Sequence, residues 1–99
     1  MTDIIFDVDG TLMDIEHRRH LVNNGNNDWE TFQDPKVMEK DTPNWPVVNV
    51  ATAMNSTVTN RVVVVSARNE RHREVTERQL EACGLGTVSY THLTLPTKA

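Results

Sequence analysis

The stretch Ile5-Phe6-Asp7-Val8-Asp9-Gly10-Thr11-Leu12 places two carboxylates two positions apart, at the end of an apolar run and just before a glycine. In a strand, residues i and i+2 point to the same side, so Asp7 and Asp9 start on one face while Val8 points into the core. Gly10 allows a sharp turn that brings backbone N–H groups close to an anion. Two carboxylates this close repel each other unless a cation lies between them, and the pattern favours a phosphoryl-transfer site. The alternative is a solvated, Asp-rich turn at the end of an edge strand.

A second apolar run, residues 62–65, consists of consecutive valines and predicts a strand that is buried on both faces of a parallel sheet. Residues 46–54 predict a helix before this strand, because Pro46 suits the first helical position. The apolar residues that recur at helical spacing, and that we expect to face the core, are Val47, Val50, Ala51 and Met54.

A further helix is expected after the valine run, over residues 70–83. Asn69 is a suitable N-cap for it, and Gly84 is a suitable stop. Glu74 and Arg78 form a favourable i,i+4 pair on its surface. Its narrow apolar side consists of Val75, Ala82 and Cys83.

The order of strand, insert, helix, strand and helix is typical of a doubly wound α/β unit. We therefore expect an α/β fold with an incomplete doubly wound, Rossmann-like parallel sheet and a small helical insert, residues 14–45, between the first two core strands. In such folds ligands bind beyond the carboxyl ends of the strands. The second of these ends carries Ser66-Ala67-Arg68. Ser66 either contacts a phosphate or simply ends the strand, and Arg68 either binds a substrate phosphate or pairs with Glu70 on the surface.

The insert opens with His17-Arg18-Arg19-His20. Arg18 and Arg19 could reach a second phosphate or a nucleic-acid backbone, and a solvated helix face is the alternative.

Later in the insert, Asn27 and Glu30 have the spacing of a capping box and predict a short helix. Trp29 and Phe32 on that helix either form a small core of the insert, which we favour, or offer a platform for base stacking.

The residues Asp7-Val8-Asp9-Gly10-Thr11 resemble the first signature of the haloacid dehalogenase (HAD) superfamily of phosphohydrolases. The resemblance implies that Asp7 is the nucleophile that forms an aspartyl-phosphate, and that Asp9 is the general acid and base. It also implies a Mg²⁺ ion held by the Asp7 side chain, the backbone carbonyl of Asp9 and a further acidic residue later in the chain. The residues that would surround the substrate phosphate are Gly10, Thr11, Ser66, Ala67 and Arg68.

With the features of the insert added, residues 3 to about 86 are similar to the phosphatase domain of polynucleotide kinase-phosphatases. This resemblance implies removal of a 3′-phosphate from a nucleic-acid end or a nucleotide, so the expected partner is one of these. Ala67 departs from the pattern, which usually has glycine there. Two alternatives stay open: a phosphatase of the same superfamily for another small phosphate ester, and a noncatalytic module that binds a metal or a phosphate.

The family also needs a third-signature lysine and a fourth-signature acidic pair. After Ser66 the last acid is Glu81 and the only lysine is Lys98. Residues 88–99 contain no acid and resemble a translated sequencing adapter. We therefore expect residues 1–87 to be the N-terminal portion of a larger phosphatase domain, inactive alone, and residues 88–99 to be a non-native tail. A genuine terminal strand is the alternative.

Composition limits the chain of 99 residues, 37% hydrophobic and 5% aromatic, to at most one small domain. The single cysteine, Cys83, excludes an internal disulfide and suits a reducing compartment. The sequence has neither a bilayer-spanning apolar stretch nor a secretory signal, so we expect a cytoplasmic location and no membrane partner. A net charge of −4 argues against broad nonspecific nucleic-acid binding. No obligate protein partner is indicated.

Overall fold

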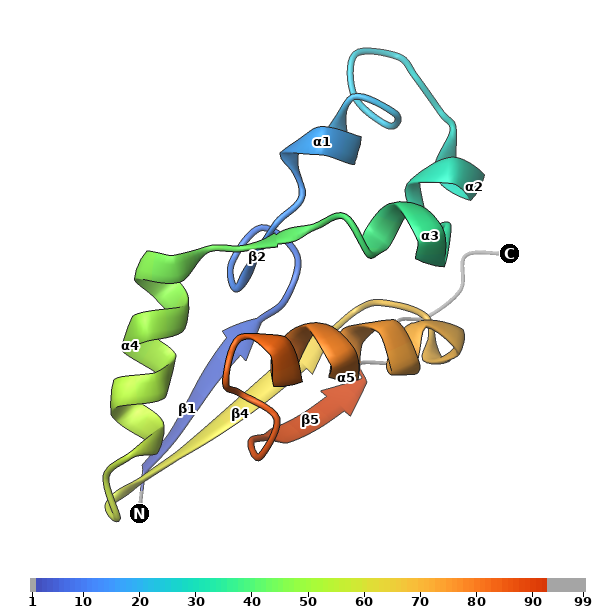
Figure 1. Ribbon diagram of the computed structural model, residues 1–99. Coiled ribbons are helices and arrows are strands. Elements are labelled where there is room, and N and C mark those ends of the chain that lie inside the picture. Colours follow the sequence, from blue (N-terminus) through green and yellow to red (C-terminus); the bar gives the residue numbers. More distant parts are fainter. Residues whose placement is uncertain (1, 93–99) are drawn as a thin grey trace.

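Three parallel strands form the central sheet, in the order β1-β4-β5 (Figure 1). In this computed structural model, which describes residues 2–92, β1 spans Thr2–Asp7, β4 spans Asn60–Ser66 and β5 spans Ser89–His92. The register sets Asp7 opposite Val65. The ends of β1 and β4 therefore carry Asp7 and Ser66 to the same edge of the sheet, as expected for parallel strands.

Two helices and a set of short elements complete the described fold. Helix α4 spans Trp45–Asn55 and α5 spans Arg73–Ala82, preceded by the 3-10 turn η1, Glu70–His72. The insert between β1 and α4 contains β2 (Met13–Asp14), α1 (Glu16–Arg19), α2 (Trp29–Phe32), α3 (Pro35–Met38) and β3 (Thr42–Pro43). No helix in the described residues is long and apolar enough to cross a membrane.

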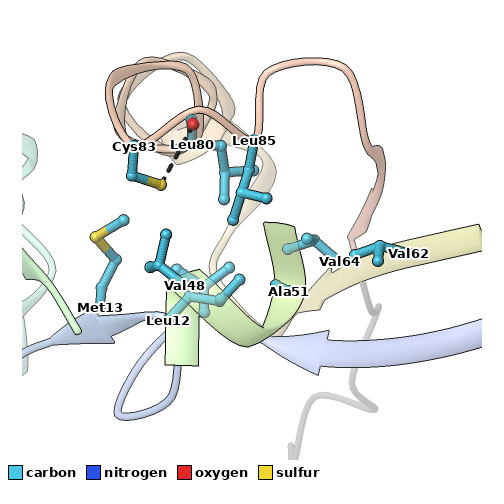
Figure 2. Packing of buried hydrophobic residues seen from close by; sticks show 10 residues of the cluster. Leu12, Met13, Val48, Ala51, Val62, Val64, Leu80, Cys83 and Leu85 are labelled. Atoms are coloured by element: carbon cyan, nitrogen blue, oxygen red, sulfur yellow. Dashed lines mark hydrogen bonds between the residues drawn. The ribbon is translucent and has the colours of Figure 1, made fainter. Parts of the chain in front are cut away.

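The hydrophobic core lies between the sheet and both helices, and Figure 2 shows side chains from α4, α5 and β4 meeting there. Val62 and Val64 of β4 are buried in it, whereas Val63 and Val65 are only half-buried. Ile5 of β1 lies opposite Val63, on the same face of the sheet, and is 65% exposed. No helix of the described residues covers this face. The members of the core cluster are Val8, Leu12, Met13, Val48, Ala51, Val62, Val64, Leu80, Cys83 and Leu85.

The expectation that the valine run is buried on both faces is therefore wrong. The strand order advances in one direction, from β1 to β4 to β5. Because parallel crossovers are right-handed, two crossovers that advance in the same direction place their helices on the same face. The described residues form a partial Rossmann-like fold, which confirms the predicted class but shows only one covered face of the sheet.

Helix α4 confirms the helix predicted for residues 46–54 but corrects its buried side. Val48 and Ala51 are buried, Val47 and Met54 pack partly against them, and Val50 is 48% exposed. The spacing rule selected Val50 because it compares only apolar residues, and the five valines and alanines of this helix fit more than one helical face.

The predicted helix over residues 70–83 begins with η1 and continues as α5. The Asn69 side chain accepts a hydrogen bond from the backbone N–H of Arg71 at 3.0 Å, and Gly84 has a φ of +87°, so both predicted end signals are confirmed. Cys83 is buried, whereas Ala82 is exposed and Leu80 is buried in its place.

The tail hypothesis for residues 88–99 stays a prediction. Ser89–His92 form β5, which pairs in parallel with β4. The residues that follow, 93–99, lie outside the described part of the chain.

Candidate active site

The turn after β1 is held by its own backbone and by two buried side chains. Val8 and Leu12 are fully buried, and the backbone N–H of Met13 donates to the carbonyl of Val8 at 2.9 Å. Gly10 lies in the left-handed region, with a φ of +77°, where a side chain would be strained. These constraints send Val8 inward, as predicted, and leave Asp7 exposed at the end of β1.

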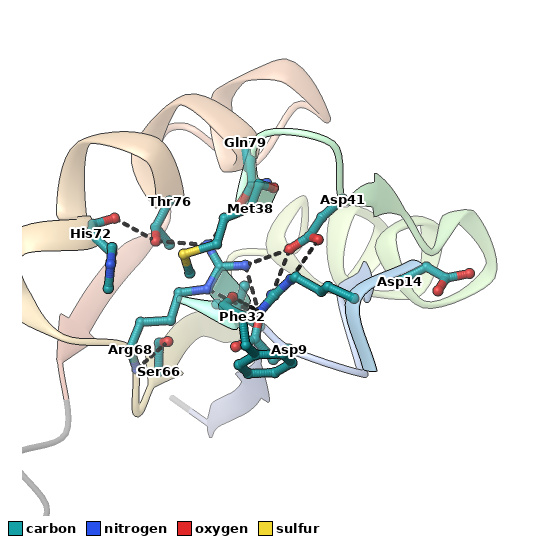
Figure 3. Close-up of polar contacts among 12 residues, drawn as sticks. Asp9, Asp14, Phe32, Met38, Asp41, Ser66, Arg68, His72, Thr76 and Gln79 are labelled. Atoms are coloured by element: carbon teal, nitrogen blue, oxygen red, sulfur yellow. Dashed lines mark hydrogen bonds and ion pairs between the residues drawn. The ribbon is translucent and has the colours of Figure 1, made fainter. Parts of the chain in front are cut away.

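Asp9 is the second residue after β1 and accepts hydrogen bonds from two arginines. Its Oδ1 atom lies 3.0 Å from Arg18 Nη2 and 2.7 Å from Arg68 Nη2. Both guanidinium groups also bind a second carboxylate, Asp41, whose Oδ2 lies 2.7 Å from Arg18 Nη2 and 3.0 Å from Arg68 Nη2 (Figure 3). Two positive and two negative side chains thus form a compact, charge-balanced network, called here the Asp9/Asp41 network.

Arg68 is almost completely buried, and all of its N–H groups have protein acceptors. Besides Asp9 and Asp41, it donates from Nη1 to Thr76 Oγ1 at 2.9 Å and to Gln79 Oε1 at 2.7 Å. The alternative of a surface pair with Glu70 is therefore wrong. In this arrangement Arg68 holds Asp9 and has no N–H left for a substrate phosphate.

Arg18 is fully buried, which excludes the solvated helix face. Its guanidinium lies 4.5 Å from the centre of the Phe32 ring and donates to the Phe32 carbonyl at 3.1 Å. Burial alone would lower the pKa of Arg18, but its contacts with Asp41 and Asp9 outweigh burial and raise that pKa. Arg18 is therefore a permanent cation that links the insert to the turn after β1.

Asp41 is a residue that the sequence analysis missed. Its carboxylate is fully buried and binds His17 Nε2 at 2.6 Å in addition to both arginines. Charge balance could have indicated that such a residue exists, because two arginines buried beside one aspartate need a second carboxylate. The insert, however, contains several acids, and sequence spacing does not distinguish Asp41 from them.

The two carboxylates of the first motif have different surroundings. Among residues 2–92, Asp7 takes part in no ion pair, and its side chain accepts only from the backbone N–H of Val8, at 2.8 Å. Asp9 is bound to arginine through Oδ1 alone, and no described hydrogen bond reaches its Oδ2 atom. The side chain of Asp9 is 30% exposed and borders a cavity of about 160 Å³.

The remaining predicted residues lie at two places around this turn. Ala67 and Arg68 border the 160 Å³ cavity together with Asp9 and Arg18. Ser66 is buried beneath them, where its hydroxyl oxygen accepts from the backbone N–H of Arg68 at 3.0 Å.

Arg19 and Gly10 border a different cavity, of about 220 Å³, on the other side of the turn. Arg19 is paired with Glu16 at 2.9 Å and is 43% exposed. Thr11 is half-buried in the turn, and its backbone N–H donates to the carbonyl of Val8 at 3.2 Å.

The short helix of the insert starts one residue later than predicted. Asp28, not Asn27, caps it, and the Asp28 carboxylate accepts from the N–H of Thr31 at 3.1 Å. Trp29 is 51% exposed and contacts the Phe32 ring edge-on, with 5.5 Å between ring centres. The favoured small core of the insert is therefore wrong for Trp29, which is half exposed, although Phe32 packs against both Trp29 and Arg18.

The oxygen atoms around Asp7 suit a hard cation such as Mg²⁺. Mg²⁺ is usually bound by one or two carboxylates, water and substrate phosphate rather than by a full protein cage. Asp7 offers a carboxylate without a cation partner, and no hydrogen bond within residues 2–92 reaches the backbone carbonyl of Asp9. The described residues contain no group of three or more His, Cys, Asp or Glu side chains that could hold a metal.

Residues 1–95 match the family model described as the polynucleotide kinase PNKP phosphatase domain. A chain in the solved structure of a Pnkp1/Rnl/Hen1 complex is similar to this one, with 26% identity and a TM-score of 0.57. That similarity covers 93% of the present chain and 26% of the solved chain. No curated protein matches.

Proposed function

The chain belongs to the family of polynucleotide kinase PNKP phosphatase domains, and from that premise we propose that it cleaves a phosphomonoester through an aspartyl-phosphate on Asp7. One observation carries the proposal. Asp7 is exposed and without a cation, as a nucleophile needs to be, whereas Asp9 is fixed through Oδ1 and keeps Oδ2 free.

The two carboxylates divide the reaction between them. Asp9 takes up a proton from solvent on Oδ2 when the negatively charged substrate binds. An Asp7 oxygen then attacks phosphorus, the bond from phosphorus to the leaving oxygen breaks, and Asp9 gives its proton to that oxygen. Asp9 next takes a proton from water, the water oxygen attacks phosphorus, and the bond between phosphorus and Asp7 breaks. Inorganic phosphate leaves, and both carboxylates are in the state that they had before the attack.

Arg18, Arg68 and Asp41 act as positioning residues in this scheme. The arginines hold Oδ1 of Asp9, and no hydrogen bond within residues 2–92 occupies Oδ2. Asp41 holds both arginines, so the geometry of Asp9 depends on a side chain that touches no reacting atom.

Mg²⁺ is the proposed cofactor, with the Asp7 carboxylate and the Asp9 backbone carbonyl as its ligands in this chain. When bound, it would offset the negative charge of the phosphoryl group and of Asp7. The lysine that the family resemblance implies is absent from residues 67–97. We therefore propose that turnover by these 99 residues alone is slow.

The proposed substrate is a 3′-phosphate on a nucleic-acid end or a nucleotide, supported by the family match and by the similarity to a chain of the Pnkp1/Rnl/Hen1 complex. We propose no obligate protein partner, and the free thiol of Cys83 supports the cytoplasm as the compartment. The runner-up is another small phosphate ester, because the cavity next to Asp9 is too small to enclose a whole nucleotide.

Phosphate release tests the proposal in single-turnover reactions with a 3′-phosphorylated oligonucleotide and, side by side, a nucleoside 3′-monophosphate. We expect Asp7→Asn to abolish release, and Asp3→Asn, an exposed acid at the far end of β1, to leave it unchanged. Release that survives Asp7→Asn would refute the covalent scheme. Faster release from an unrelated sugar phosphate than from either 3′-phosphate would favour the runner-up.

A further inference from the structure

His72 is a buried side chain of the candidate site that the proposed reaction does not use. It lies in η1, is 1% exposed and borders the same 160 Å³ cavity as Asp9, Arg18 and Arg68. Phe32 and Met38 form apolar parts of the wall. Within residues 2–92, His72 Nδ1 has no hydrogen-bond partner, although it is buried. A buried polar atom without a partner carries a cost that a ligand can remove.

The surroundings of His72 keep the imidazole neutral. Burial and the charge of Arg71 lower the pKa of His72; a hydrogen bond to the Gln33 backbone raises it, and Arg68 and Arg18 lower it further. The Nε2 atom lies 3.4 Å from Arg71 Nε, whereas Nδ1 has no hydrogen-bond partner within residues 2–92. A nitrogen of a neutral imidazole either donates or accepts one hydrogen bond, so a hydroxyl group, which can do both, is a suitable partner for Nδ1.

The cavity lies on the side of the reaction where the leaving group departs. Asp9, which gives its proton to the leaving oxygen, borders the cavity, whereas Asp7, which attacks from the other side of phosphorus, is not among its lining residues. At about 160 Å³ it is well below the roughly 300 Å³ at which drug-sized sites begin. It suits one ring of a ligand, such as a sugar, rather than a whole nucleotide.

We propose that this cavity receives the sugar that carries the scissile phosphate, and that His72 Nδ1 forms a hydrogen bond with a hydroxyl group of that sugar. The inference rests on the proposed function, because it takes the cleaved bond to be a phosphate ester of a sugar. His72 thereby distinguishes a sugar phosphate from bare phosphate, and it is a binding residue rather than an acid or base.

The imidazole nitrogens of His72 report on this contact directly. In long-range ¹H–¹⁵N spectra of the full chain, we expect a nucleoside 3′-monophosphate to shift the Nδ1 signal. Inorganic phosphate, which binds without a sugar, should shift the amide of Val8, whose N–H donates to the Asp7 carboxylate, but leave Nδ1 unchanged.

Two substitutions at His72 distinguish the effect of the hydrogen bond from the effect of the ring shape. His72→Phe should weaken binding of the nucleoside 3′-monophosphate about tenfold, the value of one hydrogen bond to a buried partner. His72→Asn keeps an N–H close to the position of Nδ1 and should retain most of the affinity. Affinity for inorganic phosphate should be the same in both. A thermal unfolding transition shows whether each variant is folded. If either variant does not fold, the spectra of the unsubstituted chain still test the proposal.

The outcomes distinguish the two proposals. Binding of the nucleotide, seen at the Val8 amide, with an unchanged Nδ1 signal would overturn the role of His72 and leave the proposed function intact. Binding of neither the nucleotide nor inorganic phosphate would overturn the proposed function, and the role of His72 with it.

Discussion

Asp7 and Asp9 carry the same functional group, and their neighbours make them different. Asp7 stands at an exposed strand end, whereas Asp9 is bound by two arginines that Asp41 holds in turn. Sequence spacing predicted the first two carboxylates, because they belong to one local turn. The Asp9/Asp41 network joins positions 9, 18, 41 and 68, and no local rule connects residues so far apart.

The buried carboxylate of Asp41 is expected to be essential for stability. Asp41→Asn removes one of two negative charges that face two buried guanidiniums, and the uncompensated charge should lower the free energy of unfolding by about 3 kcal/mol. Urea denaturation monitors the change. Asp3→Asn is the matched control, because it breaks an exposed pair with Arg61 and should have little effect. Equal stability of the two variants would contradict a structural role for the network.

His72 predicts a pH dependence of stability. Burial lowers the pKa of His72 below 6.5 in the folded chain. The charges of Arg71, Arg68 and Arg18 lower this pKa further, and the Gln33 backbone raises it. Below pH 6.5 the unfolded state binds more protons than the folded state. The stability that the neutral, buried imidazole contributes is therefore complete above pH 6.5, and it is lost as the pH falls from 6.5 through the folded pKa.

Urea denaturation at a series of pH values above and below 6.5 measures this effect. His72→Asn should flatten the slope, and His20→Gln, at an exposed position, should not. An unchanged slope in His72→Asn would show that the imidazole does not carry the effect.

At the scale of elements, the sequence predicted β1, β4, both long helices and the end signals around η1 and α5. It did not predict β2 or β3, and it offered a strand in the segment of β5 only as the alternative to a non-native tail. The predicted features depend on local patterns: consecutive valines, a proline at a helix start, a capping asparagine and a glycine stop. The side of α4 that is buried depends instead on where β4 and α5 lie. The sequence pattern therefore assigned Val50 rather than Val48 to the core, although the helix itself was predicted correctly.

A pair of valine substitutions tests the orientation of α4. Val48 is 1% exposed and Val50 is 48% exposed, so the two differ in burial but not in chemistry. Val48→Ala should lower the free energy of unfolding by about 2 kcal/mol, because it leaves a cavity in the core. Val50→Ala should change it by less than about 0.5 kcal/mol. Denaturant titration gives both values, and a larger loss for Val50→Ala would mean that the helix is rotated.

At the scale of the whole molecule, the sheet has one face covered by α4 and α5 and one face that is open in the described residues. The open face follows from the strand order, which places both crossovers on the same side. The fold class was predictable from the order of elements. The open face was not, because a run of valines has the same sequence whether one or both of its faces are covered.

The open face predicts self-association. Ile5 is 65% exposed in the middle of β1, and apolar residues on an open sheet promote contact between chains. Sedimentation velocity should show association that rises with concentration and that Ile5→Lys reduces. Val58→Lys, at a position that is 93% exposed in a loop, should not reduce it. A chain that stays monomeric at every concentration would argue against an exposed apolar face.

Phosphorylation of Asp7 leaves a chemical mark that identifies the nucleophile. Borohydride reduces an aspartyl-phosphate to homoserine, which a peptide mass spectrum locates to a single residue. After incubation with Mg²⁺ and a 3′-phosphorylated oligonucleotide, we expect homoserine at position 7, more of it in Asp9→Asn, which slows hydrolysis of the intermediate, and none in Asp7→Asn. Homoserine at another aspartate, or its absence at position 7 in a folded chain that releases phosphate, would contradict the account.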